Sequence, residues 1–101
     1  MAIAQTTLTT TEWTVIGAGV TSITFQVVSS NPVYIGIGTT AGSISSTTPG
    51  LIYKQFEGEL KKNPADLTFG SPGISTYVLA RAVTSTGTIN YETPWFYGYK
   101  K

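Results

Sequence analysis

The chain of 101 residues contains no cysteine and no histidine. Without cysteine it has no disulfide, thiolate nucleophile or zinc–thiolate site, so packing alone must hold the fold together. Without histidine it has no Ser-His-Asp or Cys-His arrangement, and it lacks the side chain that most often acts as a base near neutral pH. We therefore expect a protein that is not an enzyme and that uses no cofactor.

Charge is also scarce. Charged residues make up 11% of the chain, and six Lys or Arg against five Asp or Glu leave a net charge of +1. Basic residues never form a run longer than two, so the sequence predicts no specific nucleic-acid binding. Free monomers usually carry many mixed charges, so a neutral surface rich in Thr, Ser and Gly suggests a protein that packs against others.

Long apolar runs are missing as well. No stretch approaches the roughly 18 residues that a membrane-spanning helix needs. Residues 1–5 show neither the basic start nor the apolar centre of a signal peptide. We expect a soluble chain with no membrane contact and no export signal.

The few carboxylates predict neither a catalytic pair nor a metal site. Glu57 and Glu59 lie two positions apart, which on one strand face is about 6–7 Å, a spacing that glycosidases use. Gly58 separates them and no cleft is indicated, so surface carboxylates are the preferred interpretation. Asp66 lacks the acidic neighbours of a calcium loop.

The strongest positive signal is a period of two in apolar residues. It runs through residues 21–29 and again through residues 33–38. A polar Ser-Asn-Pro turn at 30–32 joins these runs, which predicts a β-hairpin. In the second run, Gly36 and Gly38 leave a nearly bare face that either the other sheet or a partner can approach closely.

Further elements are short. We expect strands over residues 12–16 and 51–57, the second broken by Gly58, and a helical turn with Asn63 as N-cap and Pro64 at its first position.

The longest apolar run, residues 75–84, predicts a central strand covered on both sides. Arg81 within it should pair with a carboxylate or reach the surface. A turn at 85–87 then leads into residues 88–91 as a second hairpin.

These patterns indicate an all-β protein, an antiparallel β-sandwich or barrel of jelly-roll or immunoglobulin-like kind. We expect residues 1–11 to form an extended N-terminal arm and residues 12–101 a single β domain with an aromatic C-terminal segment. The arm is either a frayed end or first edge strand of its own domain, or a segment that becomes ordered on a neighbouring subunit.

Aromatic residues are concentrated near the C-terminus, ahead of two lysines. They can pack on the domain's own core, anchor a neighbouring subunit, or stack on bases or sugars. The predicted partner-binding side chains are Leu8, Trp13, Tyr34, Trp95, Phe96, Tyr97 and Tyr99.

Three stretches, in order, resemble small bacteriophage virion proteins of the capsid-decoration or cement type. They are Ser-Asn-Pro-Val-Tyr-Ile-Gly at 30–36, Pro-Gly-Leu-Ile-Tyr at 49–53, and Ala-Asp-Leu at 65–67 with Tyr-Val-Leu-Ala-Arg-Ala at 77–82 and Ser-Thr-Gly-Thr-Ile at 85–89. The resemblance implies a structural role on a virion and no catalytic residue.

We therefore expect a virion structural protein, made in the host cytoplasm and located on the phage particle. It would stabilise the capsid lattice by bridging subunits, with the major capsid protein or other virion subunits as partners, and would itself be a homo-oligomer. The alternative is a soluble β-sandwich binding module for glycans or single-stranded nucleic acid.

Overall fold

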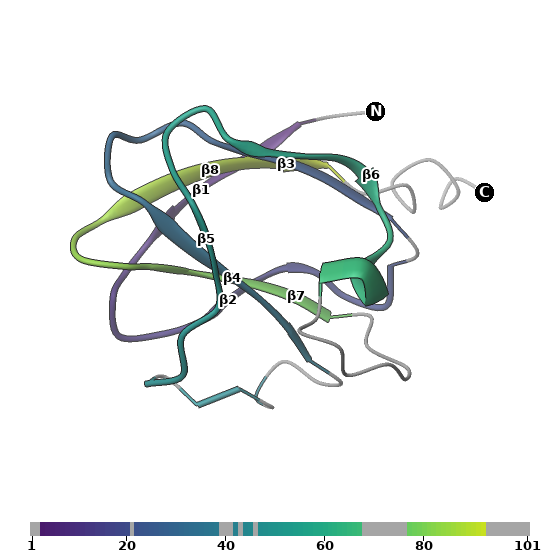
Figure 1. Cartoon of the computed structure of the whole chain (residues 1–101), viewed down its shortest axis with the longest axis horizontal. Coiled ribbons are helices and arrows are strands. Elements are labelled where there is room, and N and C mark those ends of the chain that lie inside the picture. Colours follow the sequence, from purple (N-terminus) through teal and green to yellow (C-terminus); the bar gives the residue numbers. More distant parts are fainter. Residues whose placement is uncertain are drawn as a thin grey trace.

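The protein is an antiparallel β-sandwich, as the alternation of apolar residues predicts (Figure 1). The structure, a computed structural model, describes residues 3–20, 22–38, 42, 44–45, 47–67 and 77–92. Sheet A has the strand order β1-β8-β3-β6, and sheet B has the order β2-β7-β4-β5. The strands are β1 (Ala4–Leu8), β2 (Thr14–Gly17), β3 (Ile23–Val27), β4 (Val33–Gly38), β5 (Leu51–Tyr53), β6 (Gly58–Lys62), β7 (Tyr77–Ala82) and β8 (Gly87–Glu92).

The strand pairing is that of a jelly roll. The first strand pairs with the last, β2 with β7, β3 with β6, and β4 with β5, all antiparallel. Of the connections between consecutive strands, the one between β4 and β5 stays within a sheet, and the others cross from one sheet to the other. Eight strands arranged in this way form the double-sheet jelly roll.

The two predicted hairpins are wrong, because β3 and β4 lie in different sheets, as do β7 and β8. The connection between β3 and β4 instead bonds to the connection between β7 and β8 and to the start of β8. Asn31 Nδ2 donates to the Thr86 carbonyl at 2.9 Å, and the Thr88 amide donates to Ser29 Oγ at 2.9 Å. In both a hairpin and a sandwich arch, alternate side chains face one core, so the period of two does not distinguish them.

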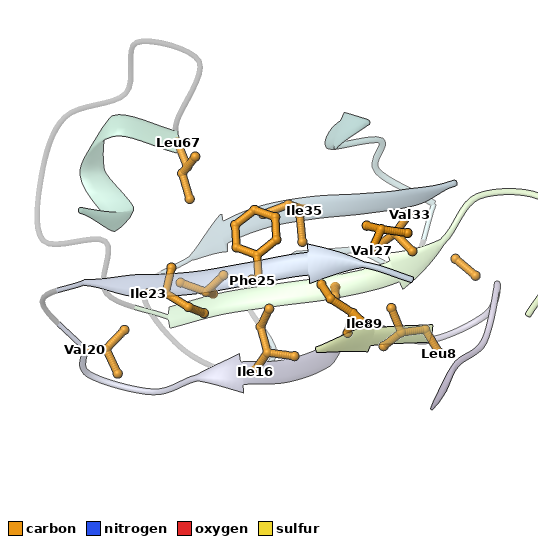
Figure 2. Close-up of a cluster of buried hydrophobic side chains, with 13 residues drawn as sticks. Leu8, Ile16, Val20, Ile23, Phe25, Val27, Val33, Ile35, Leu67 and Ile89 are labelled. Atoms are coloured by element: carbon orange, nitrogen blue, oxygen red, sulfur yellow. The ribbon is translucent and has the colours of Figure 1, made fainter. Parts of the chain in front are cut away.

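Between the sheets lies a core of aliphatic side chains and one aromatic ring (Figure 2). Leu8 and Ile89 enter it from sheet A, and Val33 and Ile35 enter it from sheet B; all four are fully buried. The predicted central strand is confirmed, since β7 lies between β2 and β4 and residues 78–82 are all buried.

Of the two interpretations of the N-terminal segment, the structure shows an edge strand of the chain's own domain. Strand β1 pairs with β8 from Ala4 opposite Tyr91 to Leu8 opposite Gly87. The segment therefore completes sheet A at one edge.

The expected strand over residues 51–57 ends early. It stops at Tyr53, and a turn follows in which the Glu57 amide donates to the Lys54 carbonyl at 3.0 Å. Gly58 begins β6 rather than breaking a strand. A Cβ there would collide with the Phe25 carbonyl oxygen, so this glycine marks a close approach of two backbones.

The predicted helical turn is present as a 3-10 helix over Pro64–Leu67, directly after Asn63. Pro64 and Leu67 are both buried, and Leu67 is part of the core (Figure 2). The helix, which follows β6 and precedes β7 in the chain, therefore contacts β4 and packs Leu67 into the core.

Candidate functional site

The outer face of sheet B is occupied by its own chain. Tyr34 on β4 lies opposite Arg81 on β7, and both side chains point away from the core. The guanidinium carbon of Arg81 lies 5.0 Å from the centre of the Trp13 ring and 4.9 Å from that of Tyr34. Two cation–π contacts thus hold a side chain that is only 7% exposed.

Arg81 also ties two loops to this face. Its Nη1 donates to the Thr10 carbonyl at 3.0 Å, and its Nη2 donates to the Thr48 carbonyl at 2.8 Å. No described carboxylate pairs with it, and its buried Nε has no partner among the described atoms. The prediction of a carboxylate partner or a surface position is therefore wrong, because aromatic faces and main-chain carbonyls stabilise this cation.

The bare face of β4 is covered in the same way. A Cβ built on Gly36 would lie 2.8 Å from Ile44 Cδ1 and 3.0 Å from a ring carbon of Trp13. The Trp13 indole is fixed by its Nε1, which donates to the Ser45 carbonyl at 2.8 Å. The space left by this glycine is thus filled by side chains from a loop and from the segment before β2.

Sheet A presents a different outer face, which carries an open groove of about 400 Å³. We call it the sheet A groove and define it by the side chains of Ile3, Thr24, Gln26, Phe56, Leu60, Asn90 and Glu92. Three of the four most exposed large apolar side chains of the described chain lie here: Ile3 at 70%, Phe56 at 67% and Leu60 at 82% exposed. Exposed apolar side chains gathered in one place commonly mark an interaction site.

The floor of the groove is polar. Cross-strand pairing places Gln26 opposite Asn90 and Thr24 opposite Glu92. Asn90 Oδ1 accepts from Gln5 Nε2 at 2.8 Å, which leaves the Asn90 amide NH₂ without a partner among the described residues. Gln26 Nε2 donates to the Phe56 carbonyl at 3.1 Å. The Gln26 Oε1 has no hydrogen-bond partner among the described residues.

Phe56 has an unusual backbone conformation, with φ at 67°. It is the third residue of the turn closed by the Glu57 amide on the Lys54 carbonyl, a position where positive φ normally selects Gly or Asn. Its amide donates to the Val27 carbonyl at 2.6 Å, which fixes the turn against β3. The ring itself is mostly exposed, so core packing does not account for a phenylalanine at this position.

The two carboxylates considered as a catalytic pair have separate structural partners. Glu57 Oε1 accepts from the Lys54 amide at 2.7 Å, within the turn. Glu59 Oε2 accepts from the Tyr53 hydroxyl at 3.0 Å. Burial, and then the bond to Glu59, raise the pKa of Tyr53 above its usual 10.0, so the hydroxyl stays protonated as a donor.

Three of the predicted partner-binding residues lie in the described parts of the chain. Leu8 is completely buried in the core, and Trp13 and Tyr34 pack around Arg81 in their own chain. The remaining four, Trp95, Phe96, Tyr97 and Tyr99, lie outside the described residues.

Sequence reasoning missed the sheet A groove. Phe56 falls in the strand expected over residues 51–57, and Leu60 falls between that strand and the helical turn expected from Asn63, so neither is predicted to be exposed. Their spacing around Gly58, two positions on either side, was the available signal that both side chains lie on one face of a turn and strand.

Within the described parts of the chain, no group of three or more acidic, His or Cys side chains could hold a metal ion. None of the described helices has the length and apolar character needed to cross a membrane. No protein-family model, no curated protein and no solved structure matches this chain.

Proposed function

We propose that this protein is a non-catalytic structural component of a bacteriophage virion, attached to a capsid lattice in the manner of a decoration protein. Its partners would be the major capsid protein or other virion subunits, and bridging between them would stabilise the lattice. The resemblance of residues 30–36, 49–53 and 65–89 to such proteins motivates this proposal.

One observation carries the proposal, namely the difference between the two outer faces of the sandwich. On sheet B the face is covered by Trp13 and by the loop that Arg81 holds. On sheet A, Ile3, Phe56 and Leu60 remain exposed beside a polar floor. Apolar side chains around a polar centre suit attachment to another protein surface, because burying them is favourable at about 25 cal/mol per Å².

The composition favours a binding or structural role over catalysis. The chain contains neither His nor Cys, and Glu57 and Glu59 are engaged in hydrogen bonds that shape their own loop and strands. Low charge suits a protein that stays packed in an assembly. As an analogy at the level of fold alone, jelly rolls occur in viral capsid proteins and in lectins.

A second candidate is a glycan-binding module that uses the same groove. The observation in its favour is the set of uncommitted polar groups on the floor, the Asn90 amide and Gln26 Oε1. Amide groups of this kind pair well with sugar hydroxyls, and the Phe56 ring could stack on a sugar face. Binding of neutral oligosaccharides by the isolated protein would favour this candidate.

Quantitative mass spectrometry of purified phage particles from the source of this gene tests the main proposal. We expect the chain in a copy number that scales with the capsid protein and persists through gradient purification. Its absence from the particles, or recovery in traces unrelated to capsid copy number, would refute the virion proposal.

A further inference from the structure

We propose that the sheet A groove binds an extended polypeptide segment of neutral or basic character, and that Phe56 is its main anchor. This inference rests on the proposed attachment to a protein lattice and names the surface and the kind of segment involved. It is carried by the register of sheet A, the conformation of Phe56 and the charge of the groove.

The groove has two apolar sides separated by the width of the sheet. Ile3 precedes β1 at one edge, whereas Phe56 and Leu60 belong to the turn before β6 and to β6 at the other edge. Adjacent strands lie about 4.8 Å apart, so the edges are about 14 Å from each other. An extended chain lying along β8 and β3 would send successive side chains toward opposite sides.

The floor matches the main chain of such a segment. In an extended chain the peptide N–H and C=O groups point at right angles to the side chains. If the side chains of the bound segment point toward the two apolar sides of the groove, some of its peptide groups therefore point toward the floor. Asn90 offers an NH₂ donor and Gln26 an amide oxygen, directly opposite each other on β8 and β3. Recognition through main-chain hydrogen bonds combined with alternate side-chain pockets is a common mode of peptide binding.

The conformation of Phe56 is the strongest indication that the groove is a binding site. A bulky residue with positive φ is strained by about 1–3 kcal/mol, and such strain gathers at binding sites. The exposed ring recovers little of this cost in the free protein, since it is 67% exposed. Lys61 has a similar φ of 49°, and although its amide donates to Thr24 Oγ1 at 2.9 Å, it is not itself a lining residue, so it provides a comparison for the backbone strain.

Charge decides between classes of partner. Among the described residues that line the groove, Glu92 is the one whose charged side chain lies on the outer face, since Glu59 pairs with the core residue Phe25 and bonds Tyr53, and none is Lys or Arg. Nucleic acid and acidic peptides are therefore disfavoured, while neutral segments and segments with Lys or Arg are accepted. The aliphatic side chains of Ile3 and Leu60 favour apolar amino-acid side chains over sugars, which stack on flat aromatic faces.

The test is a titration of the full chain, labelled with nitrogen-15, followed by NMR. The first probe is a short peptide with a central Val-Leu-Val, flanked by threonines and by a lysine at each end. The second replaces the lysines with glutamates, and the third is the neutral oligosaccharide cellohexaose. We expect the lysine peptide to shift amide signals of groove residues and to bind at least about tenfold more tightly than the glutamate peptide, about 1.4 kcal/mol.

Variants identify the anchor. Phe56→Asn keeps a residue that tolerates positive φ and should weaken binding of the lysine peptide about tenfold or more. Lys61→Asn relieves the same backbone conformation, keeps the amide that donates to Thr24, and should not weaken binding of the lysine peptide. Equal affinities for both variants, peptide-induced shifts outside the groove, or shifts with cellohexaose alone would overturn the inference.

Particle binding separates this inference from the proposed function. If the chain is present on particles and Phe56→Asn occupies them as fully as the original chain, the lattice proposal stands and the groove is not its contact. If the chain is absent from particles, the lattice proposal fails. In that case the peptide titration still decides what the groove binds.

Discussion

Replacing Arg81 with methionine should remove the interactions that fix the outer face of sheet B while keeping an apolar stem of similar length. Arg81→Met deletes the hydrogen bonds to the Thr10 and Thr48 carbonyls, at 3.0 and 2.8 Å. It also deletes the cation–π contacts with Trp13 and Tyr34. The segment before β2 and the loop before β5 then lose their common attachment to the sheet.

The expected loss of stability is the difference between the interactions that Arg81→Met removes and the desolvation cost that it recovers. Two hydrogen bonds from a charged donor contribute about 1.5 kcal/mol each at the low end of their range, and two cation–π contacts contribute about 1 kcal/mol each. Removing a buried cation returns a desolvation cost of about 2 kcal/mol. We therefore expect Arg81→Met to lower the free energy of unfolding by about 3 kcal/mol and the melting temperature by about 15 °C.

The assay is urea denaturation followed by far-ultraviolet circular dichroism, with Lys54→Met at an exposed turn as the control. Arg81→Lys should also destabilise the fold, because one ammonium group cannot bond two separate carbonyls while stacked between two rings. The reasoning is refuted if Arg81→Met changes the free energy of unfolding by less than about 0.5 kcal/mol, the range of an ordinary surface substitution.

Three further predictions concern β6 and the residues around it. Gly58→Ala should destabilise the fold by about 2–4 kcal/mol, because its Cβ would collide with a main-chain carbonyl of β3. Gly42→Ala, with open space around it, should change stability by less than about 0.5 kcal/mol in the same urea titration. The raised pKa of Tyr53 means that its contribution to stability is complete below pH 10 and is lost as pH rises further, at less than about 1.4 kcal/mol per pH unit. Tyr53→Phe should flatten this alkaline loss in unfolding titrations between pH 9 and pH 11, and an unchanged slope would contradict the bond. Phe56→Asn and Lys61→Asn should each raise the free energy of unfolding by about 1 kcal/mol through relief of strain, and a loss in both would show that no strain is stored.

The sequence was sufficient to predict the class of fold and the positions of several strands. Alternating apolar residues predicted β3 and β4, the unbroken apolar run predicted the central β7, and the Asn-Pro pair predicted the helical turn. These predictions are correct because the burial of one or both faces of a strand determines which of its positions are apolar.

The assignment of strands to sheets was not predictable by the same reasoning. A turn such as Ser-Asn-Pro reverses the chain whether the next strand pairs with the last one or crosses to the opposite sheet. The sheet that the next strand joins depends on hydrogen bonds between connections far apart in the sequence, such as the one that Asn31 donates to the Thr86 carbonyl. Contacts over such a separation leave no local pattern.

The candidate site was the least predictable part. Trp13 and Tyr34 are predicted to bind a partner, yet both rings pack against the buried Arg81 of their own chain. Phe56 was overlooked because positive φ is a property of the backbone that a phenylalanine gives no reason to expect. Residues that violate local preferences are thus found only once the structure is known.

Electron cryomicroscopy of phage particles that carry this protein tests the central claim most directly, since it shows which face of the sandwich meets the lattice. We predict that sheet A faces the capsid, with Phe56 and Leu60 in contact with an extended segment of a capsid subunit and the Arg81 side of sheet B turned to solvent. A bound protein whose sheet A groove is open to solvent, while sheet B or an edge strand contacts the lattice, would contradict it.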